Sequence, residues 1–162
     1  MRVERVDPAV TRALRNSVLR PGLPLDAVHW PALEDPEAAT FAVIGDDESP
    51  LTTVSVLPEP CPWRPDDGPA WRLRGMATTE EARGQGVGRL ALDAAVAHVR
   101  AEGAVLLWCN ARDVALSFYE RAGFVVEGAG FVSERDIPHH PMVLALATIG
   151  DLFPHSGKFL PK

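Results

Sequence analysis

The octapeptide Arg83-Gly84-Gln85-Gly86-Val87-Gly88-Arg89-Leu90 places three glycines at alternate positions, directly after a strand-like run over 70–78. Glycine leaves the backbone uncovered and adopts conformations closed to other residues, so a ligand can approach the main chain closely here. The first N–H groups of the helix expected next lack partners inside that helix and favour negative charge. A strand, a glycine turn and a helix in this order predict a cradle for phosphate or pyrophosphate. A glycine-rich turn without a ligand is the simpler alternative.

Two common phosphate-binding motifs fit this segment poorly. A P-loop needs Gly-Lys followed by Ser or Thr, whereas Gly88 precedes Arg89 and Leu90. The run from Gly86 to Ala91 has the spacing of a dinucleotide fingerprint, which also requires an acidic residue about 20 positions later. The next expected strand ends in Leu107-Trp108-Cys109-Asn110, without a carboxylate. A dinucleotide-binding domain is therefore a weak alternative.

Hydrophobic periodicity predicts an α/β fold in which helices flank a central, mixed and twisted β-sheet. Asp7-Pro8 is typical of a helix start, and that helix should carry Val10, Leu14 and Val18 on one face and stop before Pro21. Further helices are expected at 86–101, largely buried because it is apolar on two sides, and at 111–122. Strands are expected at 40–44, 51–57, 70–78, 104–109, 124–127, 130–134 and 142–147, with an ordered proline-rich loop at 58–69.

Composition limits the classes of function. A chain of 162 residues with 46% hydrophobic residues suits one globular domain spanning 1–162. Its net charge of −6 gives no general electrostatic basis for a nucleic-acid partner. No apolar run approaches the roughly 18 residues of a membrane span, and the run from Met1 to Arg5 does not resemble a signal peptide, so we expect a cytoplasmic protein. Cys61 and Cys109 form no metal-spaced pair, and a disulfide between them is not expected.

Two blocks of this chain resemble the GNAT superfamily of N-acetyltransferases. Arg83-x-x-Gly86-x-Gly88 is similar to the family's acetyl-coenzyme A signature, and residues 76–82 resemble the strand and loop that lead into it. The segment from Asn110 to Phe124 resembles the second block, in which an Asn ends a strand and a helix ends in Tyr-Glu-basic-x-Gly-Phe. The resemblance covers about 70–126, the expected cofactor core, and leaves a C-terminal strand and tail at 141–162. It implies a GNAT-like single domain that uses acetyl-coenzyme A and no metal.

The resemblance also implies which residues bind acetyl-coenzyme A. Backbone N–H groups of the glycine turn would hold the pyrophosphate, with charge-assisted contacts from Arg83 and Arg89. The pantetheine arm would pair with the strand backbone near Met76, whose N–H would stabilise the oxyanion. Asn110 would hydrogen-bond the pantetheine amides, cap the following helix together with Asp113, or do both. The expected cofactor residues are Met76, Ala77, Thr78, Arg83, Gly84, Gln85, Gly86, Val87, Gly88, Arg89, Asn110 and Ser117.

Tyr119 is the expected catalytic acid. It is the only tyrosine in the chain and occupies the position where the family places a phenol beside the coenzyme's sulfur. A phenol with a pKa near 10 stays protonated at neutral pH and can give its proton to a thiolate with a pKa of about 8.5. The alternative is a core tyrosine on a stripe with Ala115 and Ala122.

The general base is less clear from the sequence. Many family members carry a carboxylate on the strand before the signature, but residues 71–76 have none. The candidates are Glu59, Glu134, His139 and His140, and a water relay without a dedicated base is also open. Adjacent histidines in a strand point in opposite directions, so a metal site at this pair is not expected.

The acceptor itself is not specified by the sequence. Contacts with it are expected from Trp63, Trp71 and Arg74, as well as from Glu59, His139 and His140, although the aromatic residues suit packing under the proline-rich loop equally well. We expect acetyl transfer to a primary amine of a small molecule or peptide by direct attack in a ternary complex. A catalytically silent acyl-coenzyme A-binding module is the alternative, and a homodimer is expected by analogy only.

Overall fold

The computed structural model describes residues 1–133 and 135–146. Its eight strands form one sheet in the order β1-β2-β3-β4-β5-β8-β6, with β7 paired to β8, and only β4 and β5 run parallel. The strands are β1 (Arg2–Val6), β2 (Ala39–Ile44), β3 (Pro50–Pro58), β4 (Ala70–Thr78), β5 (Leu106–Arg112), β6 (Val125–Val126), β7 (Phe131–Val132) and β8 (Pro138–Ala145). The helices are α1 (Arg12–Leu19), α2 (Val87–Ala101) and α3 (Leu116–Arg121), with short 3-10 segments at Pro8–Thr11, Leu25–Val28, Pro31–Glu34, Glu80–Ala82 and Asp113–Ala115. The expected mixed α/β fold is confirmed.

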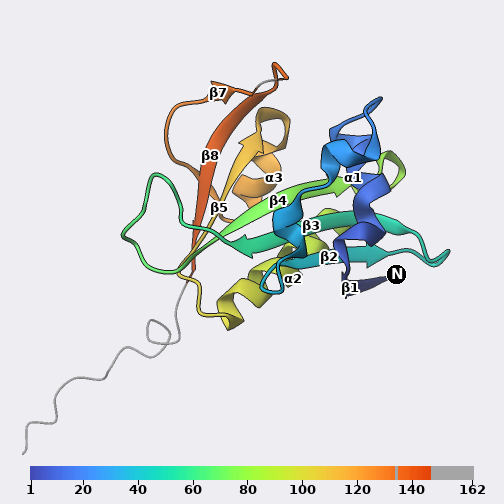
Figure 1. Ribbon diagram of the computed structural model, residues 1–162, viewed down its shortest axis with the longest axis horizontal. Coiled ribbons are helices and arrows are strands. Elements are labelled where there is room, and N and C mark those ends of the chain that lie inside the picture. The colour runs from blue at the N-terminus through green and yellow to red at the C-terminus, as the bar shows by residue number, and fades with distance from the viewer. Residues whose placement is uncertain (134, 147–162) are drawn as a thin grey trace, which may run out of the picture.

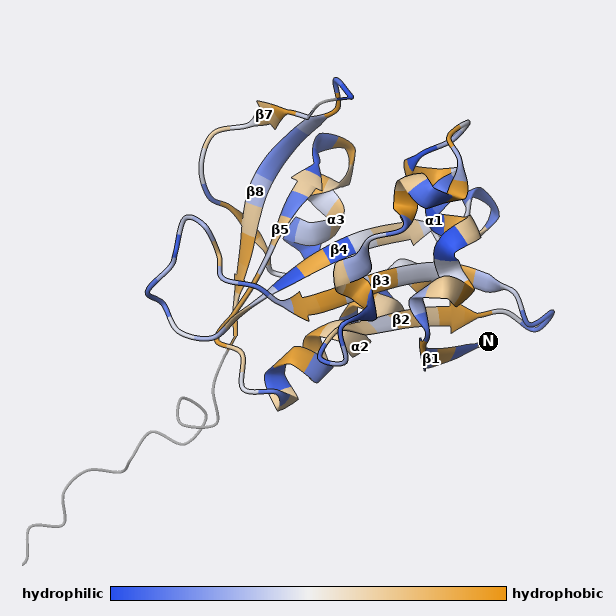
Figure 2. Cartoon of the chain, viewed as in Figure 1, coloured by the Kyte–Doolittle hydropathy of each residue, from blue (hydrophilic) through white to orange (hydrophobic). Residues whose placement is uncertain are grey.

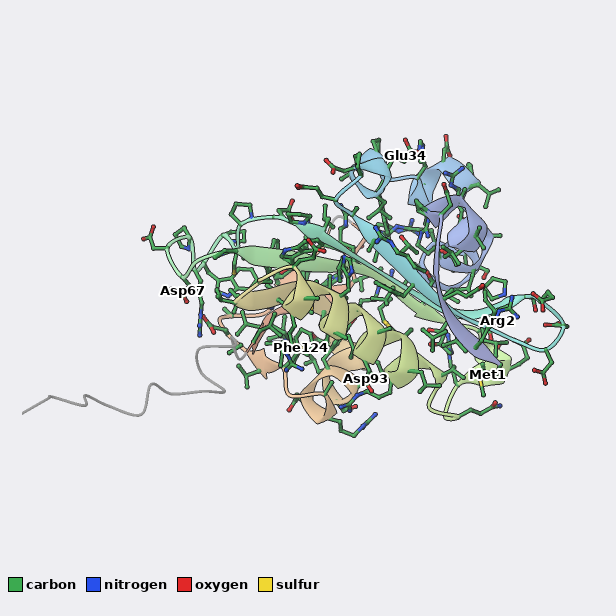
Figure 3. The ribbon with its side chains drawn as sticks, turned by 90° about the horizontal axis from the view of Figure 1, so that it is seen from below. Met1, Arg2, Glu34, Asp67, Asp93 and Phe124 are labelled. Carbon is green, nitrogen blue, oxygen red and sulfur yellow. The ribbon has the colours of Figure 1, made fainter. Side chains whose placement is uncertain are left out.

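Helices cover both faces of the sheet. Figure 3 shows the α1 region and Glu34 on one side, and α2 with Asp93 on the other. The main core lies between the sheet and α2 and α3, and Figure 2 shows the hydrophobic residues of β2 and β3 that contribute to it. Strand alternation decides which residues join this core, because successive side chains point to opposite faces. Trp71 and Leu73 face α2, whereas Arg72 and Arg74 face α1.

The sheet splits between its two parallel strands. Ladder pairs join β4 to β5 only from Ala70–Leu106 to Arg72–Trp108, after which the strands diverge into the V seen in Figure 1. β4 remains paired to β3 as far as Thr78, and β5 remains paired to β8 as far as Arg112. Beyond Arg72, the facing backbone edges of these two described strands therefore have no ladder partner, which leaves room for an extended ligand.

A bulge at Gly75 marks the split. The register between β3 and β4 shifts between Thr53 and Ser55, and Gly75 has a φ of +66°. Such a positive φ favours glycine, and a β-carbon here would also stand 3.0 Å from the Trp30 ring. Because the extra residue reverses the alternation, Met76 faces α2, where its Cε lies near Gly88.

The N-terminal region departs from the sequence expectation. β1 was not expected, and Asp7 caps a 3-10 turn, accepting from the Ala9 N–H at 2.8 Å, before α1 begins at Arg12. Val10 lies in the 3-10 turn, before α1, and is 52% exposed, so the expected helix face that joins it to Leu14 and Val18 is wrong at Val10. In its place Thr11 and Arg15 are buried, because the Arg15 Nη1 donates to the Thr11 hydroxyl at 2.7 Å.

The second block also folds differently in detail. β5 continues to Arg112, so the helix expected at 111–122 shortens to α3, and Asn110 does not cap it. Asp113 instead lies 2.6 Å from His140. Leu90 is 45% exposed, although Val87 and Ala91 on the same expected face are buried, so burial of α2 on that side is only partial. β8 begins at Pro138, earlier than expected, while Glu134 and the tail at 147–162 lie outside the described residues.

Candidate active site

An open pocket lies at the N-terminus of α2, where the glycine turn was expected to bind phosphate. Gly84 and Gly86 have φ values of +77° and +80°, and a β-carbon on either would meet nothing within 4 Å. Arg89 is held by Asp93 at 2.8 Å. The pocket is lined by Thr78, Ala82, Arg83, Gly84, Gly86, Val87, Gly88, Arg89, Phe118 and Arg121. Backbone N–H groups at a helix start beside three arginines provide the electrostatics that an anionic ligand requires.

An apolar groove continues from this phosphate pocket toward the split in the sheet. It shares Thr78, Arg83 and Phe118 with that pocket. Its other lining residues are Val18, Leu19, Met76, Ala77, Arg112, Val114 and Ala115. Val114 is 91% exposed, which is unusual for a large aliphatic side chain and leaves apolar surface free for a ligand.

A central cavity of about 300 Å³ fills the gap between β4 and β5 and shares lining residues with the groove, among them Met76 and Ala115. Residues from both faces of the sheet reach it, because the strands no longer touch there. Its lining comprises Leu19, Arg20, Trp30, Arg72, Leu73, Arg74, Gly75, Met76, Cys109, Asn110, Ala111, Arg112, Ala115, Tyr119, Phe131 and His139. The phosphate pocket, the groove and the central cavity therefore follow one another along one continuous path.

Tyr119 lies where α3 meets this cavity. Its side chain belongs to the core, with the residue 5% exposed and the ring packed edgewise on Phe118 and Phe124. Its hydroxyl makes no hydrogen bond to any described residue, yet it is not among the fully enclosed polar atoms, so it meets open space. Burial, and secondarily the neighbouring Cys109, holds the pKa of Tyr119 well above its ordinary value. The packing role and the chemical role are thus compatible.

The two adjacent histidines of β8 face opposite sides of the sheet. His139 pairs with Arg112 in the ladder, lines the cavity and stacks on Phe131 with ring centroids 5.4 Å apart. Its Nδ1 lies 2.7 Å from the Ile137 carbonyl oxygen, which can only accept, so the neutral ring carries its proton on Nδ1 and its lone pair on Nε2. His140 contacts Asp113 and does not line the cavity.

The other acceptor candidates divide between cavity and packing. Arg74 lines the cavity, with its guanidinium carbon 4.5 Å from the Trp30 ring centroid. Glu59 stays outside the lining and pairs with the Arg72 Nη1 at 3.2 Å. Trp71 is 6% exposed, packs on His98 in the main core and does not line the cavity. Trp63 packs on Trp108 beneath the proline-rich loop, as the packing alternative predicted.

The remaining sequence expectations are met unequally. Ser117 is exposed and lines none of these three spaces, and the Gln85 side chain donates to the Glu81 carbonyl rather than facing the phosphate pocket. Phe118 and Arg121 were missed, although both lie within the second block and their spacing of three positions places them on one face of the expected helix. The cavity residues Arg20, Trp30, Arg112 and Phe131 were also missed, and only a longer β5 would have indicated Arg112.

Across residues 1–133 and 135–146, no group of three or more His, Cys, Asp or Glu side chains could hold a metal ion. Cys61 and Cys109 are both buried as free thiols. No helix in this part of the chain is long and apolar enough to cross a membrane.

Comparison with known proteins gives this geometry its context. Residues 9–124 match the model of a family described as the acetyltransferase (GNAT) family. The uncharacterized N-acetyltransferase YitI of Bacillus subtilis (strain 168) is 28% identical over 139 residues, which cover 85% of this chain and 89% of that protein.

Solved structures share the fold over most of the chain. An N-acyl amino acid synthase from uncultured soil microbes matches with a TM-score of 0.73 and 16% identity, covering 90% of this chain and 95% of that one. An aminoglycoside 6'-N-acetyltransferase complexed with coenzyme A matches with a TM-score of 0.68 and 14% identity, covering 90% of this chain and 97% of that one.

Proposed function

Because this chain belongs to the GNAT family of acetyltransferases and uses acetyl-coenzyme A as its co-substrate, we propose that it acetylates a primary amine of a small molecule or peptide by direct attack in a ternary complex. The observation that carries this proposal is the central cavity between β4 and β5, which Tyr119 lines from one face of the sheet and His139 from the other. Acetyl-coenzyme A and the amine can meet in such a gap, so the acetyl group can be transferred directly, without a covalent enzyme intermediate.

The order of the three spaces suits the donor. Backbone N–H groups from Gly84 to Arg89, with the Arg83 guanidinium, would hold the pyrophosphate at the start of α2. The apolar groove along Met76, Ala77 and Thr78 would hold the pantetheine arm, and the unpaired edge of β4 offers backbone partners to its amides. When bound, acetyl-coenzyme A supplies a thioester, which exchanges its thiol for an amine.

Tyr119 is suited to protonate the departing sulfur. Its phenol keeps its proton throughout the neutral range, since burial raises its pKa. The same surroundings raise the pKa of the Cys109 thiol to about 12. A thiolate released beside Cys109 would likewise be more basic than in water, because desolvation penalises its charge. The proton transfer from phenol to thiolate therefore remains feasible despite the raised pKa of Tyr119.

His139 is suited to accept the proton that the amine loses on forming the amide. Its Nδ1–H is engaged by the Ile137 carbonyl, so Nε2 carries the lone pair. No Asp or Glu within the described residues lines the cavity, which leaves His139 as the lining side chain best suited to act as a base. The backbone N–H of Met76 would stabilise the negative charge that develops on the carbonyl oxygen.

Thiol release from acetyl-coenzyme A against a panel of primary amines, with the acetylated product identified by mass spectrometry, tests this function. We expect amine-dependent release and one acetyl group on the product nitrogen. Tight binding of acetyl-coenzyme A without transfer to any amine would favour the silent binding module.

A further inference from the structure

Three arginines from different elements converge on the α1 side of the central cavity. Arg20 directly follows α1, Arg74 belongs to β4, and Arg112 ends β5. The Arg20 Nη1 and the Arg112 Nη2 both donate to one atom, the Leu19 carbonyl oxygen, at 3.0 and 2.8 Å. Two guanidinium groups are thus held side by side at the C-terminal end of a helix, where the dipole favours positive charge.

Within the described residues, these three guanidinium groups have no carboxylate partner. The ion pairs of this region join Arg72 to Glu59 and His140 to Asp113, and neither includes Arg20, Arg74 or Arg112. Burial lowers the pKa of each of the three, and neighbouring arginines lower it further: Arg20 acts on both Arg74 and Arg112. The chain as a whole carries a net charge of −6, so this positive cluster is a local feature of the cavity.

Like charges held together in a partly desolvated site are unfavourable until an anion offsets them. Guanidinium groups match the planar geometry of carboxylate and the oxygens of phosphate, and they bind both with charge-assisted hydrogen bonds. The phosphates of the donor do not account for this cluster, because the phosphate pocket has its own arginines, Arg83, Arg89 and Arg121.

Resting on the N-acetyltransferase function proposed above, we propose that the acceptor is an anionic amine, whose carboxylate or phosphate is bound by Arg20, Arg74 and Arg112 while its nitrogen faces the gap between β4 and β5. The Trp30 ring beneath Arg74 gives this subsite an apolar wall. Polycationic amines are disfavoured acceptors, because their additional charges would be repelled by the cluster.

Matched pairs of acceptors test the charge requirement. One arm compares an α-amino acid with its carboxamide, and the other compares O-phosphoethanolamine with ethanolamine, with spermidine as a cationic acceptor. The carboxamide has the less basic amine, so rates are compared per unit of free base. We expect at least one anion to exceed its neutral counterpart by roughly 10- to 100-fold in kcat/KM, as for hydrogen bonds to a charged group. The pair of acceptors that shows this difference in kcat/KM identifies the anionic group that the subsite binds, either carboxylate or phosphate.

Arginine variants locate the subsite. Arg112→Gln and Arg74→Gln should lower kcat/KM for the anionic acceptor by a similar factor, mainly through KM, and lower it much less for the neutral acceptor. Arg74→Gln should also leave the affinity for acetyl-coenzyme A nearly unchanged, because Arg74, unlike Arg112, does not line the apolar groove. Arg100→Gln, on the exposed side of α2, is the control and should change neither. Circular dichroism establishes that each variant is folded.

The outcomes separate this inference from the function on which it rests. The anion subsite is overturned if kcat/KM for the neutral and cationic acceptors equals or exceeds that for the anionic ones. It is also overturned if the Arg112 and Arg74 variants lose activity toward all acceptors equally. Either result is compatible with the proposed N-acetyltransferase function. Absence of transfer to any acceptor, of any charge, overturns the proposed function itself.

Discussion

Cys109 of β5 and Tyr119 of α3 line the same cavity, and burial holds both side chains in their protonated forms. The pKa of the Cys109 thiol is raised to about 12, and that of the Tyr119 phenol lies well above its ordinary value. A protonated phenol is a proton donor, whereas a protonated thiol is a poor nucleophile. The two protonated side chains therefore favour direct transfer assisted by Tyr119 as an acid over a route through an acetylated Cys109.

Tyr119→Phe should lower kcat by about 10²–10⁴-fold, because it removes the general acid and keeps the ring that packs on Phe118 and Phe124. The affinity for acetyl-coenzyme A and the free energy of unfolding should change little. Steady-state kinetics, calorimetric titration and thermal unfolding measure the three quantities. A variant with wild-type kcat would mean that the phenol is structural.

The pH dependence provides an independent control on the same residue. Since the pKa of Tyr119 is raised, its active, protonated form persists above pH 10, and kcat should show no alkaline decline from phenol ionisation below about pH 10. Tyr119 is the only tyrosine in the chain, so the ultraviolet absorbance of phenolate reports its ionisation alone. Phenolate that appears near pH 9 in the folded protein would contradict the buried environment.

Cys109→Ala should retain acetyl transfer within a few-fold of wild type, because a thiol with a pKa of about 12 is almost entirely protonated at neutral pH. Stability should fall modestly, since the side chain is buried in the main core. Intact-protein mass spectrometry of the wild type after mixing with acetyl-coenzyme A alone should show no added acetyl group. An acetylated enzyme that disappears when amine is added would replace direct attack with a two-step mechanism.

Gly86→Ala should weaken binding of acetyl-coenzyme A by at least about 10-fold, because the added methyl group projects into the open phosphate pocket. The left-handed backbone also adds a strain of roughly 1–2 kcal/mol to the folded state. Gly103→Ala is the matched control, since Gly103 has a φ of +85°, an equally open surrounding and no part in the phosphate pocket. Equal effects of the two variants on affinity would show that only strain was measured.

His139→Asn should slow transfer while His140→Asn should not. An Asn amide nitrogen can replace Nδ1–H in the bond to the Ile137 carbonyl, so the change removes chiefly the lone pair on Nε2. The defect should persist at pH values above the pKa of the amine, because an amine that enters as the free base still loses a proton on forming the amide. Equal pH profiles for wild type and His139→Asn would assign the proton to water.

The sequence predicted the elements on either side of the glycine turn better than the side chains that gather around the central cavity. The glycine turn, β4 and α2 are local features, in which residue type and spacing determine the backbone directly. Arg20 and Arg112 are far apart in the sequence. Both donate to the Leu19 carbonyl oxygen because α1 packs on the split sheet. No local pattern indicated the end of the β4–β5 ladder at Arg72 or the bulge at Gly75.

The predicted boundary between β5 and the following helix was wrong, because a strand pattern and a helix-cap pattern overlap there. Asn110 and Asp113 have the spacing of a capping box, and this suggested a helix from Ala111. Pairing with β8 outweighed the cap and extended β5 to Arg112, opposite His139. Trp71 was expected at the acceptor, but strand alternation alone, counted from Arg72 and Arg74, would have assigned it to the core.

A crystal structure of the protein with coenzyme A tests the central claim most directly, because it locates the donor's sulfur relative to Tyr119. We predict the pyrophosphate on the backbone N–H groups from Gly84 to Arg89, the pantetheine arm along β4, and the sulfur within hydrogen-bonding distance of the Tyr119 hydroxyl. Coenzyme A bound outside the gap between β4 and β5, or with its sulfur beyond the reach of Tyr119, would contradict the account.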